Sequence, residues 1–148
     1  MNKRYATQWI GQFGVASELA RRNYLVSLTL GNAPIRDMLC QSPNGENFAI
    51  QVKSLTTKTY FPFQDILINK KFSDLHLVFV YIPAVLNQSL EYFVLTHSRF
   101  LEIWKEEQKE WAEKEKLRAK PYEKWSNGIQ YKTLLKSSAK NDWSDLPR

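Results

Sequence analysis

The segment 75–82, with the sequence LHLVFVYI, constrains the fold more than any other part of the chain. It is a nearly continuous apolar run of strand length, and Pro83 ends it. Such runs are typical of strands that are buried on both faces of a sheet, because both sets of alternating side chains then need apolar surroundings. The run therefore predicts an internal strand whose sheet is covered by helices on both faces.

An amphipathic helix is predicted over residues 7–22, with Thr7 as a candidate N-cap and Asn23 as a left-handed end. Its predicted core-facing side follows the spacing of three and four residues and consists of Trp9, Phe13, Ala16 and Ala20. Gly11 and Gly14 lie on another side of this helix. A glycine inside a helix costs about 1 kcal/mol relative to alanine, so these two indicate a close approach to the sheet or to a ligand.

Further strands are predicted over 24–30, 35–41, 48–55 and 92–95. Residues 56–63 fit either an extended loop or a short strand. Helices are predicted over 65–72 and 98–120, the second one stopped by Pro121. The fold class is therefore α/β, with a mixed β-sheet flanked by helices. A length of 148 residues suits a single domain, here a core over 7–96 and a charged, aromatic-rich helical C-terminal extension over 97–148.

The composition limits where such a chain can work. No apolar run approaches the roughly 18 residues that span a bilayer, and no apolar signal core follows the basic N-terminus. Cys40 is the only cysteine, which excludes an internal disulfide and a cysteine-based zinc cage. We therefore expect a cytoplasmic protein with no membrane partner. The net charge of +6 and the pI near 9.4 make a polyanionic partner plausible, although charge alone favours an ordinary basic protein.

Several familiar catalytic patterns are missing from the sequence. There is no G-x-x-x-x-G-K phosphate loop and no G-x-G-x-x-G. His76 and His97 are too isolated to form a zinc motif, and Cys40 in a predicted strand fits a small core residue better than a nucleophile.

A polar cluster around one hairpin is the strongest chemical signal that remains. Asp37 lies on the first arm, while Gln51 and Lys53 share one face of the second arm because strand side chains alternate. With Pro43–Gly45 as a three-residue loop, Asp37 falls opposite Gln51 on that same face. A two-residue Asn-Gly loop would put Asp37 on the other face, and Pro43 favours the first register.

Glu18 offers a second carboxylate, on the side of the first helix that carries the glycines. Its position on the helical wheel alone favours a solvated residue paired with Arg21 or Arg22. The same wheel leaves open the possibility that Glu18 faces the hairpin cluster.

Glu18 on a first helix, Asp37 on a strand, a turn and then Gln51-Val52-Lys53 resemble the PD-(D/E)XK nuclease superfamily in its Q-x-K variant. The likeness is greatest to archaeal-type Holliday junction resolvases and Mrr-like restriction endonucleases, and it covers residues 8–96. Arg36 stands where the family has its proline, and Gln51 where it usually has an acid. The resemblance implies a restriction-endonuclease-like αβββαβ core.

The resemblance also implies a magnesium-dependent or manganese-dependent endonuclease, a hydrolase that acts on DNA. Asp37, Gln51, the carbonyl of Val52 and Glu18 would then bind Mg²⁺ or Mn²⁺, which prefer oxygen ligands, and Lys53 would act on the water or the phosphate. The alternatives are a nuclease-fold protein that binds nucleic acid or regulates without cleaving, and an adaptor that binds proteins through its charged helix. A homodimer is compatible with all three.

Basic and aromatic residues complete the sequence signals. Five cations flank the predicted cleft in sequence and are the candidate nucleic-acid contacts: Arg21, Arg22, Lys58, Lys70 and Lys71. The extension carries many aromatic side chains, which could stack on bases but more commonly anchor a charged helix to its domain. We expect packing from them: Trp104, Trp111, Tyr122, Trp125, Tyr131 and Trp143.

Overall fold

The computed structural model describes residues 3–30, 33–120 and 127–148. In chain order its elements are α1 (Lys3–Ala20), β1 (Leu25–Leu28), β2 (Met38–Gln41), β3 (Asn47–Leu55), β4 (Tyr60–Pro62), α2 (Ile66–Asn69), β5 (Leu75–Tyr81), β6 (Glu91–Thr96), α3 (His97–Glu115), β7 (Gly128–Gln130) and α4 (Tyr131–Lys136). The predicted α/β class is confirmed. The helix predicted over 98–120 is shorter, because α3 ends at Glu115 with Lys116 as its C-cap; Pro121, its predicted stop, lies outside the described residues, as do Tyr122 and Trp125.

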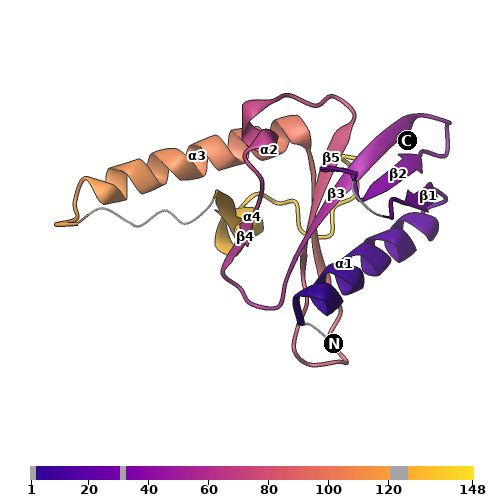
Figure 1. Ribbon diagram of the computed structural model, residues 1–148, viewed down its shortest axis with the longest axis horizontal. Coiled ribbons are helices and arrows are strands. Elements are labelled where there is room, and N and C mark those ends of the chain that lie inside the picture. The colour runs from indigo at the N-terminus through magenta and orange to yellow at the C-terminus, as the bar shows by residue number, and fades with distance from the viewer. Residues whose placement is uncertain (1–2, 31–32, 121–126) are drawn as a thin grey trace.

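A five-stranded mixed sheet forms the centre of the fold, in the order β1-β2-β3-β5-β6 (Figure 1). Strands β3 and β5 are parallel, and every other neighbouring pair is antiparallel. Strand β5 is buried along almost its whole length and lies between two other strands. The apolar run of residues 75–82 is thus the internal strand that its sequence predicts.

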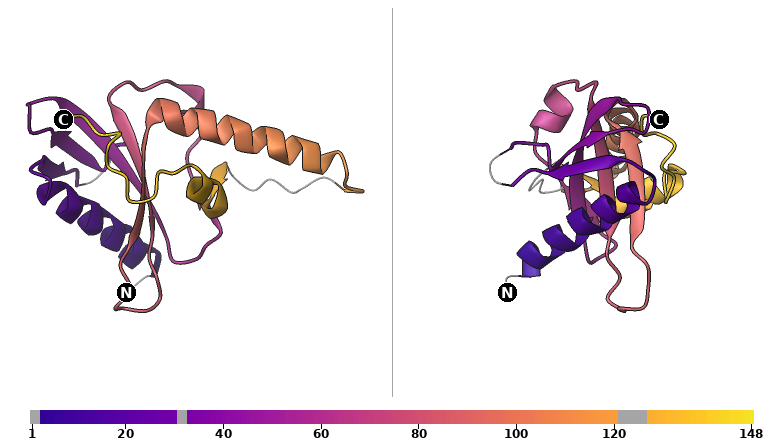
Figure 2. Two further views of the ribbon diagram at one scale, coloured as in Figure 1. Left: turned by 180° about the vertical axis from the view of Figure 1, so that it is seen from behind. Right: turned by 90° about the vertical axis from the view of Figure 1, so that its right-hand side faces the viewer.

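The sheet has a hydrophobic core on each face. Helix α1 covers one face, where Val15 and Leu19 join Met38, Ile50 and Val78 in one buried cluster. On the other face, Phe79 and Phe93 form a cluster with α3, α4 and the small sheet of β4 and β7. Figure 2 shows α1 on one side of the sheet and α3 running away from the other side.

Helix α1 packs on a different side from the one predicted. Its buried residues are Gly11, Gln12, Val15 and Leu19, whereas Phe13 and Ala20 are exposed. The reason is the close approach of helix and sheet at Gly11, where an added Cβ would lie only 1.8 Å from the Ser54 hydroxyl oxygen. The helix also begins at Lys3, so Thr7 is not its N-cap, and the Thr7 hydroxyl donates to the Lys3 carbonyl at 2.9 Å. Asn23 has the predicted left-handed conformation, with φ of 64°.

Other boundaries differ for local reasons. Strand β2 begins only at Met38, because Ile35 adopts a left-handed φ of 58° that an extended strand does not allow. Helix α2 is a single turn, since the backbone at Lys70 is already extended. Residues 60–62, which the sequence left as loop or strand, pair with β7 as strand β4.

The C-terminal extension takes part in both cores. Tyr131 and Leu134 of α4 lie in the cluster under α3, and Trp143 and Leu146 lie in the cluster under α1. Trp104 is packed against the first of these clusters, so the packing role predicted for Trp104, Tyr131 and Trp143 is confirmed. Among the described residues, no helix is long and apolar enough to cross a membrane.

Candidate functional site

The β2–β3 hairpin has the three-residue loop that places Asp37 opposite Gln51. Gln41 pairs with Asn47, and the Ser42 N–H donates to the Glu46 carbonyl at 2.8 Å. The loop between them is Pro43-Asn44-Gly45, and Gly45 takes a φ of 91° that favours glycine. The Ser42 carbonyl accepts the Gly45 N–H, which closes the turn at 2.9 Å.

Asp37 is fixed against β3 by two hydrogen bonds that bracket Gln51. Its N–H donates to the Ile50 carbonyl at 2.8 Å, and its Oδ2 accepts the Val52 N–H at 2.7 Å. Met38 pairs with Ile50 one residue further on. The carboxylate therefore takes the place of a backbone acceptor at the point where β2 begins.

Gln51 is buried at the same position, with 4% of its surface exposed. Its Oε1 has no hydrogen-bond partner among the described residues. A buried acceptor without a donor is costly, by about 1–3 kcal/mol, and such groups in native proteins commonly mark a functional site or a bound ion. Ser54 Oγ, His76 Nδ1 and Trp104 Nε1 are likewise buried without a partner among the described residues, and the Gln51 oxygen is the one that lies beside Asp37.

Lys53 follows on the same face of β3 as Gln51, and is partly buried. Burial lowers the pKa of Lys53 and raises the pKa of Asp37, and each charge partly offsets the effect on the other. The two charges therefore lie within electrostatic reach in a partly dry setting, where their interaction is stronger than in water.

In the described part of the chain, the side of β3 that faces β2 has no strand partner beyond Asp37, because β2 begins at Met38. Odd-numbered residues of β3 bond to the β5 side, as Ala49 N–H does to the Asp74 carbonyl, and even-numbered residues turn toward β2. The N–H and C=O of one extended residue point to the same side of a strand. The Val52 carbonyl therefore faces the side on which its N–H meets Asp37.

Glu18 does not join this group. Its carboxylate contacts Arg21 at 2.9 Å and Arg22 at 2.6 Å, the pairing that its position on the wheel favours. The hydrogen bond from Arg22 is the main reason that the pKa of Glu18 is lowered. Glu18 lies on α1 near Tyr92 of β6, whose pKa its charge helps to raise, and β6 is three strands away from β2.

The five candidate phosphate contacts are spread over the molecule. Arg21 and Arg22 hold Glu18, and Arg22 also lies over the Trp143 ring at 4.7 Å. The Lys58 ammonium lies over the rings of Tyr81 and Tyr131. Neither group adjoins Asp37 through any of these contacts.

Lys70 and Lys71 are better placed than the other three cations. They are exposed in the connection that leads to Phe72, and the Arg36 guanidinium lies 5.8 Å from the Phe72 ring. Because Arg36 directly precedes Asp37, this connection borders the site. Arg36 also contacts Asp74 at 3.2 Å.

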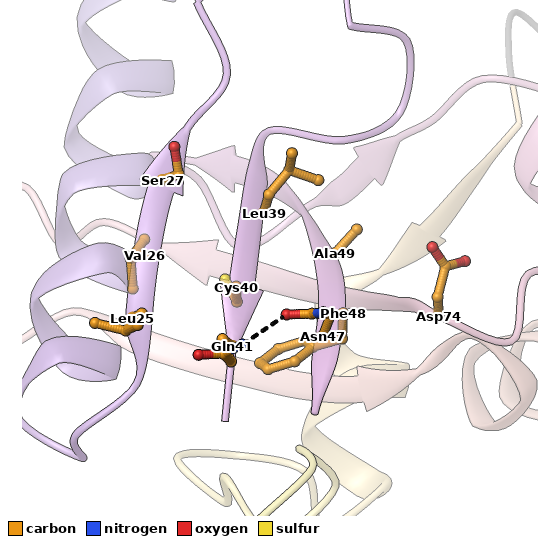
Figure 3. Close-up of a pocket in the computed structure, with 10 residues that line it drawn as sticks. All are labelled: Leu25, Val26, Ser27, Leu39, Cys40, Gln41, Asn47, Phe48, Ala49 and Asp74. Atoms are coloured by element: carbon orange, nitrogen blue, oxygen red, sulfur yellow. Dashed lines mark hydrogen bonds between the residues drawn. The ribbon is translucent and has the colours of Figure 1, made fainter. Parts of the chain in front are cut away.

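A hollow of about 520 Å³ lies beside the site, on the strands β1 to β3 (Figure 3). Leu39 and Ala49 form one cross-strand pair of its floor, and Asp37 and Gln51 lie two residues away from them along the chain, past the Met38–Ile50 pair. The hollow holds few polar groups, among them the Gln41 amide, which donates to Asn47 at 3.1 Å. Cys40 also lines the hollow, but burial raises its pKa to about 12, so the thiol is inert.

Two features of α1 were missed by the sequence reasoning. Arg4, at the start of α1, lies near enough to Lys53 to lower its pKa. Gln12 is 5% exposed on the packed side of α1, and the sequence analysis gave it no role. The glycine at position 11 was the one available signal, because it marks the side of the helix that approaches the sheet.

The ability of the site to hold a metal ion depends on one carboxylate. Within the described residues, no group of three or more His, Cys, Asp or Glu side chains could hold a metal ion. Asp37, the Gln51 oxygen and the Val52 carbonyl offer oxygen donors of the kind that Mg²⁺ and Mn²⁺ accept, with waters filling the other positions.

Comparisons with known proteins add no assignment to this geometry. No protein-family model, no curated protein and no solved structure matches the chain.

Proposed function

We propose that this protein is a metal-dependent nuclease that hydrolyses phosphodiester bonds in DNA. The observation that carries the proposal is the unpartnered, buried Oε1 of Gln51 beside the Asp37 carboxylate, with Lys53 on the same face. An acid, an oxygen acceptor and a cation in one partly dry position suit the binding of a metal ion and a phosphate together.

The arrangement of the elements supports this proposal. Helix α1 is followed by the antiparallel strands β1 to β3, a short helix, and then β5 parallel to β3. With β4 set aside in its separate two-stranded sheet, this order is compatible with the restriction-endonuclease-like αβββαβ core that the sequence resemblance implies. Asp37, directly before β2, and Gln51-Val52-Lys53 on β3 are the residues to which the resemblance would give the roles of the PD-(D/E)XK site.

The donor set consists of oxygen atoms, which Mg²⁺ and Mn²⁺ prefer, but it carries only one negative charge. Asp37 supplies the only carboxylate charge, and Gln51 and Val52 supply neutral oxygens. A bound Mg²⁺ or Mn²⁺ would neutralise phosphate charge and acidify a water molecule. An unpartnered Gln51 oxygen is available for such an ion without breaking any bond of the described residues.

The side chains have separate tasks in this scheme. Asp37 and Gln51 orient oxygen donors toward one position, and the Val52 N–H fixes the carboxylate through its bond to Oδ2. The Lys53 ammonium stabilises negative charge that develops on the phosphate oxygens. Its partial burial puts this ammonium in a setting where a hydrogen bond to phosphate is stronger than in water.

Cleavage of labelled DNA by Asp37→Ala tests the proposal. Duplex, branched and single-stranded substrates are incubated with Mg²⁺ or Mn²⁺, beside the wild type and a control variant, Glu113→Ala, which removes an exposed acid near the C-terminal end of α3. Loss of divalent-dependent cleavage in Asp37→Ala alone supports the proposal. Equal cleavage by all three proteins would assign the activity to another site or to a contaminant.

A second candidate function is nucleic-acid binding without cleavage. The placement of Glu18 with Arg21 and Arg22 favours it, because the site is then left with a single carboxylate. Gln51→Glu separates the two candidates. An active enzyme changes its metal preference with this substitution, whereas an inactive one gains cleavage that the wild type lacks.

A further inference from the structure

Strand β1 is the outermost strand at one end of the five-stranded sheet (Figure 1), and β2 is its only strand neighbour in the described part of the chain. The Thr29 N–H donates to the Asp37 carbonyl at 3.0 Å, so the odd-numbered residues of β1 turn their backbone groups toward β2. The N–H and C=O groups of Val26 and Leu28 therefore turn outward. No described residue forms a hydrogen bond with these outward groups.

The opposite edge of the same sheet is covered. The Val94 N–H of β6 donates to the Ala139 carbonyl at 3.3 Å, and the Asn141 N–H donates to the Tyr92 carbonyl at 2.6 Å. Proteins commonly protect the edge of a sheet by such a cover, by a lysine or by a proline. The described residues provide no cover of this kind for β1, and residues 23–33 contain neither a charged residue nor a proline.

Apolar side chains beside the free edge are open to solvent. Leu25 exposes 68% of its surface and Leu30 exposes 80%. Val26 and Leu28 are only partly buried, against the cluster under α1. An uncharged edge with exposed leucines is a template on which another strand can pair.

We propose that β1 pairs with β1 of a second copy of this chain, in an antiparallel arrangement centred on Ser27. The outward groups of Val26 and Leu28 are two residues apart in the strand. A two-fold axis at Ser27 therefore sets Val26 of each copy opposite Leu28 of the other, and both members of each pair donate and accept a backbone hydrogen bond. The two sheets then form one continuous sheet.

The same register also matches the side chains on the two sides of the axis. Leu25 lies opposite Thr29 of the second copy, and Leu30 lies opposite its Tyr24, so both exposed leucines gain a neighbour. At the centre, Ser27 meets Ser27, a small and exposed residue. One register thus satisfies the backbone and the side chains and opposes no charges, which favours a second copy over an unrelated strand.

The pairing also determines how the two copies are oriented. A two-fold axis between antiparallel edge strands is perpendicular to the sheet, so each face of one copy continues as the same face of the other. The two copies therefore present their hollows, each with Asp37 beside it, on one side of the joint sheet. The inference goes beyond the proposed function and does not depend on it.

Sedimentation over a range of protein concentrations tests the pairing. The mass of the wild type should rise with concentration from 17.4 kDa toward twice that value. Ser27→Lys sets two like charges opposite each other, so the dissociation constant of the dimer should rise roughly 10- to 100-fold. Leu39→Lys makes a matched change on the same face, at a 51% exposed position one strand from the edge. Because its charges are farther apart and screened by salt, this control should stay within about threefold of the wild type.

Ser27→Cys tests the register. The Cα atoms of a directly opposed pair without mutual hydrogen bonds lie about 4.5 Å apart, a distance that a disulfide can span. Mild oxidation should therefore convert this variant into a covalent dimer that a reducing agent separates. Leu25→Cys is the control, because residue 25 lies opposite Thr29 and not opposite itself. The native Cys40 is buried and present in both variants.

A wild type that stays monomeric at every concentration overturns the proposal. A dimer that Ser27→Lys leaves intact also overturns it, because another surface then joins the copies, and equal cross-linking of Ser27→Cys and Leu25→Cys overturns the register. Circular dichroism confirms that each variant is folded, and Ser27→Cys, which adds no charge, keeps the test available if Ser27→Lys does not fold. None of these measurements involves cleavage, so the proposed function is tested separately through Asp37.

Discussion

The Asp37 carboxylate accepts the backbone N–H of Val52 at 2.7 Å, across the position of Gln51. This bond ties the start of β2 to the middle of β3 and gives the carboxylate one orientation. It also explains how a chain with a single acid at this position can hold that acid in a buried, well-defined place. The consequences for stability and for metal binding differ, and both can be measured.

Asp37→Asn should change the pH dependence of stability. Burial raises the pKa of Asp37 above its ordinary value of 3.8, so the folded state favours the protonated acid. The stabilising contribution is complete below 3.8 and is lost as the pH rises through the higher folded pKa. The melting temperature of Asp37→Asn relative to the wild type should therefore rise between about pH 4 and pH 7, as followed by thermal melts. A difference that falls over this range would contradict the assigned shift.

Gln51→Glu should make stability depend on divalent ions. A carboxylate at a position that is 4% exposed is desolvated and lies near the Asp37 charge, so the metal-free variant should melt several degrees lower. Mg²⁺ at 100 times its dissociation constant should restore about 2.7 kcal/mol. Thermal melts with and without Mg²⁺ measure both effects.

Gln51→Leu provides the control for that experiment. It removes the unpartnered oxygen and adds no charge, so its melting temperature should be at least that of the wild type and should not respond to Mg²⁺. A Gln51→Glu protein that Mg²⁺ fails to stabilise would show that these residues do not bind the ion.

Lys53→Met should slow cleavage without removing metal binding, because the ammonium acts on the phosphate and not on the metal ion. We expect a loss of roughly 100-fold in the single-turnover rate, the usual scale for one electrostatic contact in a transition state. Calorimetric titration with Mn²⁺ should give an affinity close to that of the wild type. Loss of both cleavage and Mn²⁺ binding would place Lys53 in a structural role.

Gly11→Ala should destabilise the fold although alanine favours helices. The added Cβ would meet the Ser54 oxygen at 1.8 Å and the Ser54 Cβ at 3.0 Å, which outweighs the gain of about 1 kcal/mol in helix propensity. Denaturant unfolding should show a lower midpoint, partly restored by Ser54→Gly in the same chain. An independent, additive effect of the two substitutions would mean that they do not meet.

The sequence predicted best where the signal was local. Pro43 and Gly45 specify a three-residue loop, and that loop sets the register that brings Asp37 to Gln51. The apolar run 75–82 likewise identifies β5 without knowledge of its neighbours. In both cases a few adjacent residues carry the whole constraint.

Prediction from the sequence failed where the local structure depends on contacts with distant parts of the chain. Strand β4 exists because Tyr60 pairs with Gln130. No residue near position 60 indicates this partner, which lies 70 residues further along the chain. The side of α1 that is buried was misread because Trp9 and Phe13 outweigh Gly11 in any apolar pattern, whereas the packing follows the smallest residue. The resemblance assigned Glu18 to the site, whereas in the structure its carboxylate pairs with Arg21 and Arg22.

The most direct measurement is anomalous diffraction from a crystal of the wild-type protein soaked in Mn²⁺. The proposed site predicts a peak within coordination distance of Asp37 and of the Gln51 Oε1, and no peak at that position in Asp37→Ala crystals. A map without a peak there, or with one held by other residues, would contradict the central claim that this hairpin is a metal site.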